Sequence, residues 1–165
     1  MRALLEALST TRSLDRLRGW TVHRAEVTVA ARRPVDPEAV VLDREGAVHR
    51  WPLRWEWLAD DRSAADLGAD RLEGAIRALG GLAYAVTMPA WLADDGTLWV
   101  LGPRDRPPSH EEVVVIAAGD HAGREVLVGL VSRRPPRPGI DPWERAALRE
   151  PEPLLPPLGR AVGGR

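Results

Sequence analysis

The stretch Glu112–Arg133, EVVVIAAGDHAGREVLVGLVSR, contains two apolar runs, Val113–Ala118 and Val126–Val131, joined by a short connector with Gly, Asp and His. Runs that are apolar on both faces and rich in β-branched residues are typical of strands inside a sheet. We therefore expect this stretch to form the central hairpin of a sheet. Its role in this interpretation is structural, because it carries no recognisable catalytic motif.

The composition indicates one domain encoded by a GC-rich genome. A chain of 165 residues, 44% of them hydrophobic, is long enough to build a single core. Cys, Lys, Phe, Asn and Gln are all missing, and three of these are encoded by AT-rich codons, which favours a high-GC bacterial source. Without Cys or Lys, the sequence excludes disulfides, thiolate metal sites, Schiff-base lysines and P-loops.

Charge and hydropathy argue against nucleic-acid and membrane partners. Arg outnumbers the acidic residues in residues 1–33 and 133–165, whereas acidic residues outnumber Arg in residues 34–132. A nucleic-acid-binding domain is expected to concentrate Arg on its folded body, and here that body is acidic. No run has the length of a membrane span, and the amino terminus lacks an apolar signal core. We expect a cytoplasmic protein.

The N-terminal segment is predicted to form a helix followed by a strand. Apolar residues recur every three or four positions in residues 2–18, which favours a helix that ends at Gly19. Trp20–Ala31 follows as a strand, because Val27 and Val29 fall on one face and charged residues on the other.

The next segment is predicted to form a hairpin and a Trp-rich edge strand. Ala39–Leu42 and Ala47–Trp51 flank a turn with Gly46 at positive φ. Trp51–Leu58, WPLRWEWL, fits a strand with three Trp on one face, or a helix with Pro52 in its first turn. The strand is the better fit, and Pro52 then favours an edge position because it cannot donate to a ladder.

One more helix and a second hairpin are predicted before the central one. Ala69–Leu79 has a helical apolar face, and Leu82–Met88 alternates as a strand does. Trp91–Leu101 surrounds Asp95 and Gly96, a dipeptide typical of a two-residue type I′ turn.

Eight of the fifteen prolines follow residue 134, where we predict a domain boundary. Residues 1–134 would form a single α+β domain, and residues 135–165 a Pro/Arg-rich tail, partly disordered, with one short helix at Asp141–Arg149. The order of elements predicts a mostly antiparallel sheet of about six to eight strands with two main helices on one face. This order resembles that of small secretion-chaperone-like and roadblock-like domains.

Polar residues with catalytic potential do not form a known motif. None of the four His has a second His at metal-ligand spacing, and no Ser lies in a nucleophile elbow. The acidic pairs are adjacent in sequence, so their carboxylates would point to opposite faces of a strand. We predict no catalytic residue, metal or cofactor, and the balance leans away from an enzyme.

Exposed tryptophans are the best candidates for binding. Most of the seven Trp are expected to fill the core, because the chain has no Phe and one Tyr. The main hypothesis is a non-enzymatic protein-interaction domain, adaptor-like or chaperone-like, that uses the edge strand for a protein partner or a homo-oligomer. The alternative is a small-molecule-binding or enzymatic domain with a Trp/Arg-lined pocket between helix and sheet. The candidate binding residues are Trp51, Arg54, Trp55, Trp57 and Tyr84.

Overall fold

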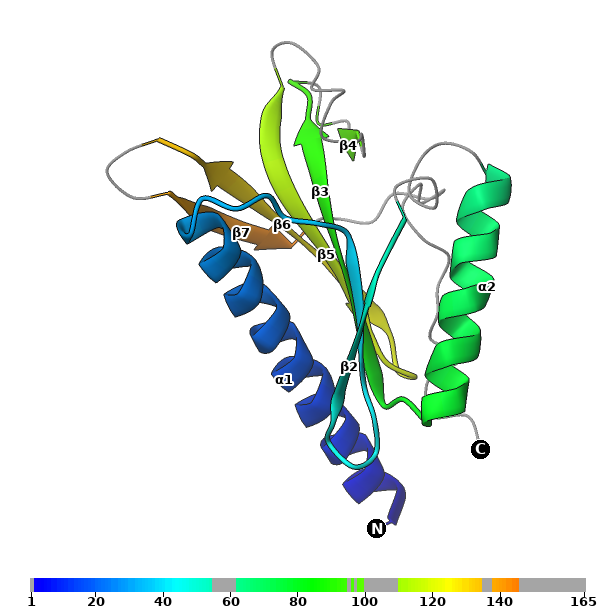
Figure 1. Ribbon diagram of the computed structural model, residues 1–165. Helices are drawn as coiled ribbons and strands as arrows, with labels where there is room; N and C mark the ends of the chain where they lie inside the picture. The colour runs from blue at the N-terminus through cyan, green and yellow to red at the C-terminus, as the bar shows by residue number, and fades with distance from the viewer. Residues whose placement is uncertain are drawn as a thin grey trace.

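The computed structural model describes residues 2–54, 62–94, 96, 98–99, 110–134 and 138–145 (Figure 1). In these residues it has two helices and a seven-stranded antiparallel sheet, which confirms the predicted α+β class. The elements in chain order are α1 (Arg2–Ala30), β1 (Glu38–Leu42), β2 (Val48–Pro52), α2 (Arg62–Leu79), β3 (Ala83–Leu92), β4 (Leu98–Trp99), β5 (Glu111–Gly119), β6 (Arg124–Ser132) and β7 (Gly139–Arg145).

Six strands follow one another across the sheet in the order β2-β1-β3-β5-β6-β7, and the short β4 pairs with the end of β3. β5 and β6 both lie inside the sheet, with Val113 opposite Leu130. The central hairpin predicted from Glu112–Arg133 is therefore confirmed. In β5, Val113–Gly119 are buried on both faces, as the unbroken apolar sequence predicts, whereas β6 is buried only at Val126, Leu127 and Gly129.

The two helices cover opposite faces of the sheet (Figure 1). Val40 and Leu42 of β1 pack on the α1 side together with Val29, whereas Val41 packs on the α2 side together with Ile76. The prediction that both helices lie on one face is therefore wrong. A strand that is apolar on both sides needs a covering layer on each of them.

Helix α1 continues through the segment that was predicted to be a strand. Thr21, Ala25 and Val29 recur every four residues, and all three are buried. The predicted helix end at Gly19 and the predicted strand Trp20–Ala31 are therefore wrong. Burial of this repeat against the sheet outweighs the low helix propensity of the β-branched residues and of the glycine.

An arginine ends α1 where a glycine is more usual. Arg32 has a φ of 58°, and its N–H donates to the Val29 carbonyl at 2.8 Å. The N–H of Arg33 donates to the Thr28 carbonyl at 3.0 Å, which completes a Schellman motif. The chain then reverses direction and enters β1 beneath α1.

The β1–β2 hairpin agrees with its prediction. Gly46 has a φ of 83° in the turn, and β2 is the terminal strand of the sheet order. Pro52, which has no N–H, is the last residue of that edge strand. The predicted strand Trp51–Leu58 therefore does not continue through Leu53 and Arg54, and its residues 55–58 lie outside the described residues. The predicted helix Ala69–Leu79 is also confirmed, as part of α2.

Strand β3 is longer than predicted and runs through Pro89. Thr87 is the last β3 residue that pairs with β1, and Trp91 is the first that pairs with β4 on the same side. Pro89 falls in the gap between them, so its missing N–H interrupts no ladder there. Trp91 lies opposite Trp99, whereas the predicted two-residue turn would place it opposite Val100. That predicted register is wrong by one residue.

Strand β7 lies where a short helix was predicted. Asp141–Arg149 was expected to be helical, but its first five residues belong to β7, and Trp143, Glu144 and Arg145 pair with β6, so the sheet continues past residue 134. Ile140 is buried in the α1-side core, and the indole Nε1 of Trp143 donates to Glu26 Oε1 at 3.0 Å. Gly129 of β6 leaves the space that these two side chains occupy. The rest of the predicted tail lies outside the described residues.

Candidate functional site

The predicted binding residues fall into three groups. Tyr84 is only 2% exposed in the core beneath α2, and half-buried Trp51 packs against the same core. Arg54 is exposed just after β2. Trp55 and Trp57 lie outside the described residues. Trp51 and Tyr84 therefore share one face of the sheet, but of these two only Trp51 is accessible.

The hydrogen bonds at both ends of the β1–β2 ladder show which residues of β2 direct their backbone N–H and C=O groups away from β1. Asp43 N–H donates to the Ala47 carbonyl at 3.0 Å, and Leu53 N–H donates to the Pro37 carbonyl at 2.9 Å. Backbone hydrogen bonds alternate along an antiparallel pair. The odd-numbered residues of β2 therefore bond to β1, and the even-numbered residues direct their backbone groups away from it.

The outer edge of β2 thus presents the N–H and C=O groups of Val48 and Arg50 and the carbonyl of Pro52. Within the described part of the chain, no strand pairs with this edge. The side chains of His49 and Trp51 lie beside it on the α2 face and stack, with ring centroids 6.4 Å apart. This edge is the first candidate binding surface.

The β1–β2 turn is held by one carboxylate. Asp43 Oδ1 accepts the N–H groups of Glu45 at 2.9 Å and Ala47 at 2.8 Å. Its Oδ2 lies 2.7 Å from His49 Nε2. The hydrogen bond from His49, followed by those from the backbone, lowers the pKa of Asp43 below its ordinary value of 3.8. This pair fixes the orientation of the His49 ring next to Trp51.

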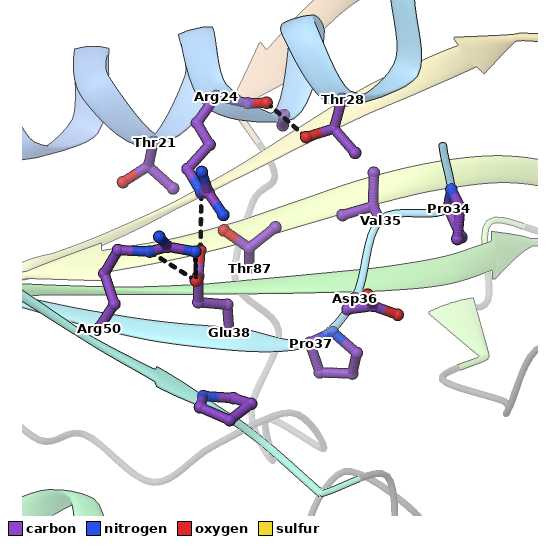
Figure 2. A pocket seen from close by; sticks show the side chains of 12 residues that line it. Thr21, Arg24, Thr28, Pro34, Val35, Asp36, Pro37, Glu38, Arg50 and Thr87 are labelled. Atoms are coloured by element: carbon purple, nitrogen blue, oxygen red, sulfur yellow. Dashed lines mark hydrogen bonds and ion pairs between the residues drawn. The ribbon is translucent and has the colours of Figure 1, made fainter. Parts of the chain in front are cut away.

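A cleft of about 480 Å³ opens on the other face of the same edge, between α1 and the first three strands of the sheet order (Figure 2). Its roof is the α1 surface with Thr21, Ala25 and Thr28, which are too small to fill the space above the sheet. Its floor and walls come from the α1–β1 connection, β1, β2 and β3: Pro34, Val35, Asp36, Pro37, Glu38, Arg50, Pro52 and Thr87.

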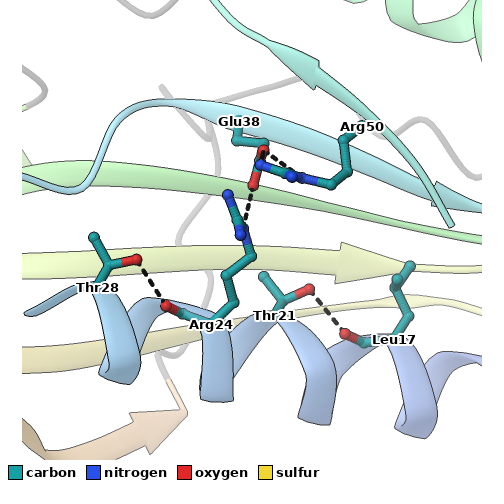
Figure 3. A network of polar contacts seen from close by, with 6 residues as sticks. All are labelled: Leu17, Thr21, Arg24, Thr28, Glu38 and Arg50. Atoms are coloured by element: carbon teal, nitrogen blue, oxygen red, sulfur yellow. Dashed lines mark hydrogen bonds and ion pairs between the residues drawn. The ribbon is translucent and has the colours of Figure 1, made fainter. Parts of the chain in front are cut away.

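Two arginines converge on one carboxylate in this cleft (Figure 3). Arg24 Nε, from α1, donates to Glu38 Oε2 at 3.0 Å. Arg50, from β2, donates to Glu38 Oε1 through Nε at 2.7 Å and also through Nη2. The guanidinium of Arg24 also lies 5.7 Å from the ring centroid of Trp20. The network links helix, inner strand and edge strand.

The register of the sheet explains why these groups meet. Glu38 of β1 lies opposite Thr87 of β3 and opposite Pro52 of β2, and all three point to the α1 face. Arg50 is two residues before Pro52 in β2, so it is the diagonal neighbour of Glu38. The hydroxyls of Thr21 and Thr28 donate to carbonyls of their own helix.

Sequence reasoning missed this cleft because it placed Arg24 on a strand. Once the helix is continued to Ala30, Thr21, Ala25 and Thr28 form a stripe of small residues beside Arg24. A stripe of small residues beside an arginine on the same helix is the sequence pattern from which the cleft could have been predicted. The predicted helix–sheet pocket lined by Trp and Tyr84 differs from this cleft, because Trp51 and Tyr84 face the α2 side.

In the part of the chain that the structure describes, no group of three or more His, Asp or Glu could hold a metal ion. No described helix has the length and apolar character needed to cross a membrane. Comparisons with protein-family models, with curated proteins and with solved structures found no match.

Proposed function

We propose that this chain is a non-enzymatic protein-interaction domain, adaptor-like or chaperone-like, that binds its partner by strand addition to β2. The observation that carries the proposal is the outward direction of the backbone groups of Val48 and Arg50 on the terminal strand. An extended segment of a second protein would hydrogen-bond to these groups, as in other cases of β-augmentation.

The side chains next to this edge favour β2 over the other terminal strand, β7. His49 and Trp51 are both half-buried and stack on the α2 face of β2. Accessible Trp side chains are enriched at the centre of protein interfaces. Trp55, Trp57 and Arg54 follow closely in sequence and are proposed as further members of the same surface. We place the domain in the cytoplasm of a high-GC bacterium.

The length of the open edge limits what can bind. Only two outward N–H groups precede Pro52, which has none. The added segment is therefore short, and most of the affinity has to come from side chains that pack on Trp51 and His49. Short, proline-terminated edges of this type also protect a sheet from indiscriminate aggregation.

Site-specific photo-crosslinking in the native host tests this proposal. A benzoylphenylalanine in place of exposed Ala47, the residue just before β2, is expected to crosslink to one partner protein or to a second copy of the chain. The same group in place of exposed Glu144 of β7 is the matched control on the opposite edge.

Two substitutions at one position distinguish the contribution of the backbone N–H to partner binding from that of the side chain. Val48→Pro removes an outward N–H, whereas Val48→Ala shortens the side chain and keeps that N–H. We expect the crosslinked product to be lost in Val48→Pro and retained in Val48→Ala, with circular dichroism confirming that both fold. Equal crosslinking from Glu144, or an unchanged product in folded Val48→Pro, would contradict strand addition at β2.

A further inference from the structure

We propose that the cleft between α1 and the sheet binds a small organic anion, with its carboxylate or phosphate held between Arg24 and Arg50. This inference goes beyond the protein-interaction function, because the cleft lies on the α1 face and the aromatic pair on the α2 face. Either function can exist without the other.

The two arginines retain donors that Glu38 does not use. Within the described part of the chain, Glu38 accepts hydrogen bonds only from the Nε of Arg24 and from the Nε and Nη2 of Arg50. Both Nη groups of Arg24 and the Nη1 of Arg50 therefore keep N–H donors. A guanidinium has five N–H donors in a planar fork, an arrangement that suits two oxygens of a carboxylate or phosphate.

Glu38 orients the arginines without cancelling their charge. Two guanidinium groups and one carboxylate leave a formal charge of +1 at this end of the cleft. Asp36 lines the cleft as well, but its exposed carboxylate points away from Glu38 in Figure 2. The Arg24 guanidinium reaches down from α1 above Thr87, so an anion there would meet both arginines (Figure 2).

The remaining walls suit an apolar body attached to that anion. Ala25, Val35 and three prolines line the cleft, and prolines hold their backbone with little freedom. The site is thus formed before any ligand arrives, which lowers the entropy lost on binding. A volume of about 480 Å³ matches clefts that hold small molecules.

Titration of the isotope-labelled full chain with four probes tests the proposal by NMR. Benzoate and phenyl phosphate carry the anionic group, benzyl alcohol is the neutral analogue, and benzylamine is the cationic one. We expect at least one anion to bind with a Kd at or below about 1 mM and to shift the signals of Glu38, Arg50 and Thr87. Benzoate alone would identify a carboxylate ligand, and phenyl phosphate alone a phosphate ligand.

Variants separate an anion site from a purely structural ion pair. Arg24→Met and Arg50→Met are each expected to weaken anion binding about tenfold or more. Glu38→Gln is expected to strengthen it several-fold, because it removes a competing negative charge. Arg77→Met is the control, since Arg77 pairs with Glu73 on the exposed face of α2.

Three results would overturn the proposal. The first is binding of neither anion to the wild-type chain. The second is equal binding of benzyl alcohol. The third is unchanged anion binding in folded Arg50→Met, which lies on the edge strand and leaves the helix packing intact. Loss of photo-crosslinking from Ala47 would not affect these results, so the two proposals fail separately.

Discussion

Asp43 and His49 face each other across the β1–β2 turn, with His49 Nε2 2.7 Å from Asp43 Oδ2. The other oxygen of Asp43 accepts two backbone N–H groups of the turn. One carboxylate therefore fixes both the turn and the ring that stacks on Trp51. The shape of the proposed binding edge depends on this side chain.

The stability contributed by Asp43 should vanish in acid. Its pKa is lower in the folded chain than the ordinary value of 3.8, so its carboxylate stabilises the fold above that value. This contribution is lost as the pH falls through the folded pKa. We expect Asp43→Ala to lower the urea midpoint at neutral pH, with the difference from wild type shrinking below pH 3.8. Glu45→Ala in the same turn is the control, and a pH-independent difference for Asp43→Ala would contradict the prediction.

Gly129 should not tolerate a side chain. A Cβ added there would lie 2.7 Å from Trp143 Cε3 and would also overlap Ile140. Gly129→Ala is expected to lower the free energy of unfolding by about 1–3 kcal/mol, measured by urea denaturation. Gly123→Ala, where a Cβ meets open space, should change it by less than about 0.5 kcal/mol. Equal effects of the two substitutions would show that β7 does not pack on Gly129.

Substituting Ala for two glycines, one inside α2 and one just after it, should change the stability of the chain in opposite directions. Gly74 lies inside the helix with open space around its Cα, so Gly74→Ala should stabilise the chain by about 1 kcal/mol. Gly80 follows the helix with a φ of 61°, so Gly80→Ala should destabilise it by roughly 1 kcal/mol. Thermal unfolding followed by circular dichroism measures both. A change of the same sign in both variants would contradict the helix end described here.

Local sequence patterns predicted the elements that depend on local signals. The apolar runs of β5 and β6, the Gly46 turn and the helix at Ala69–Leu79 were all found from such signals. The errors arose where distant packing decides the conformation. Thr21, Ala25 and Val29 are helical because the sheet buries them. Trp143 lies in a strand because Gly129 of β6 leaves room for its indole ring.

The candidate sites were predicted only in part. The sequence predicted an edge strand at Trp51–Leu58, and the edge strand of the structure, β2, contains Trp51 but ends at Pro52. The cleft could not be predicted, since Arg24, Glu38 and Arg50 meet only after α1 and the β1–β2 hairpin have taken their places. Residues that lie 12 and 14 positions apart in sequence leave no local motif for such a site.

Amide hydrogen exchange along β2 in the isolated full chain, resolved by NMR, shows whether the outer edge of this strand is open. We expect fast exchange at Val48 and Arg50, whose N–H groups point outward, and slow exchange at His49 and Trp51, whose N–H groups bond to β1. Equally slow exchange at all four residues in the monomeric chain would contradict it, because another segment would then already occupy the edge.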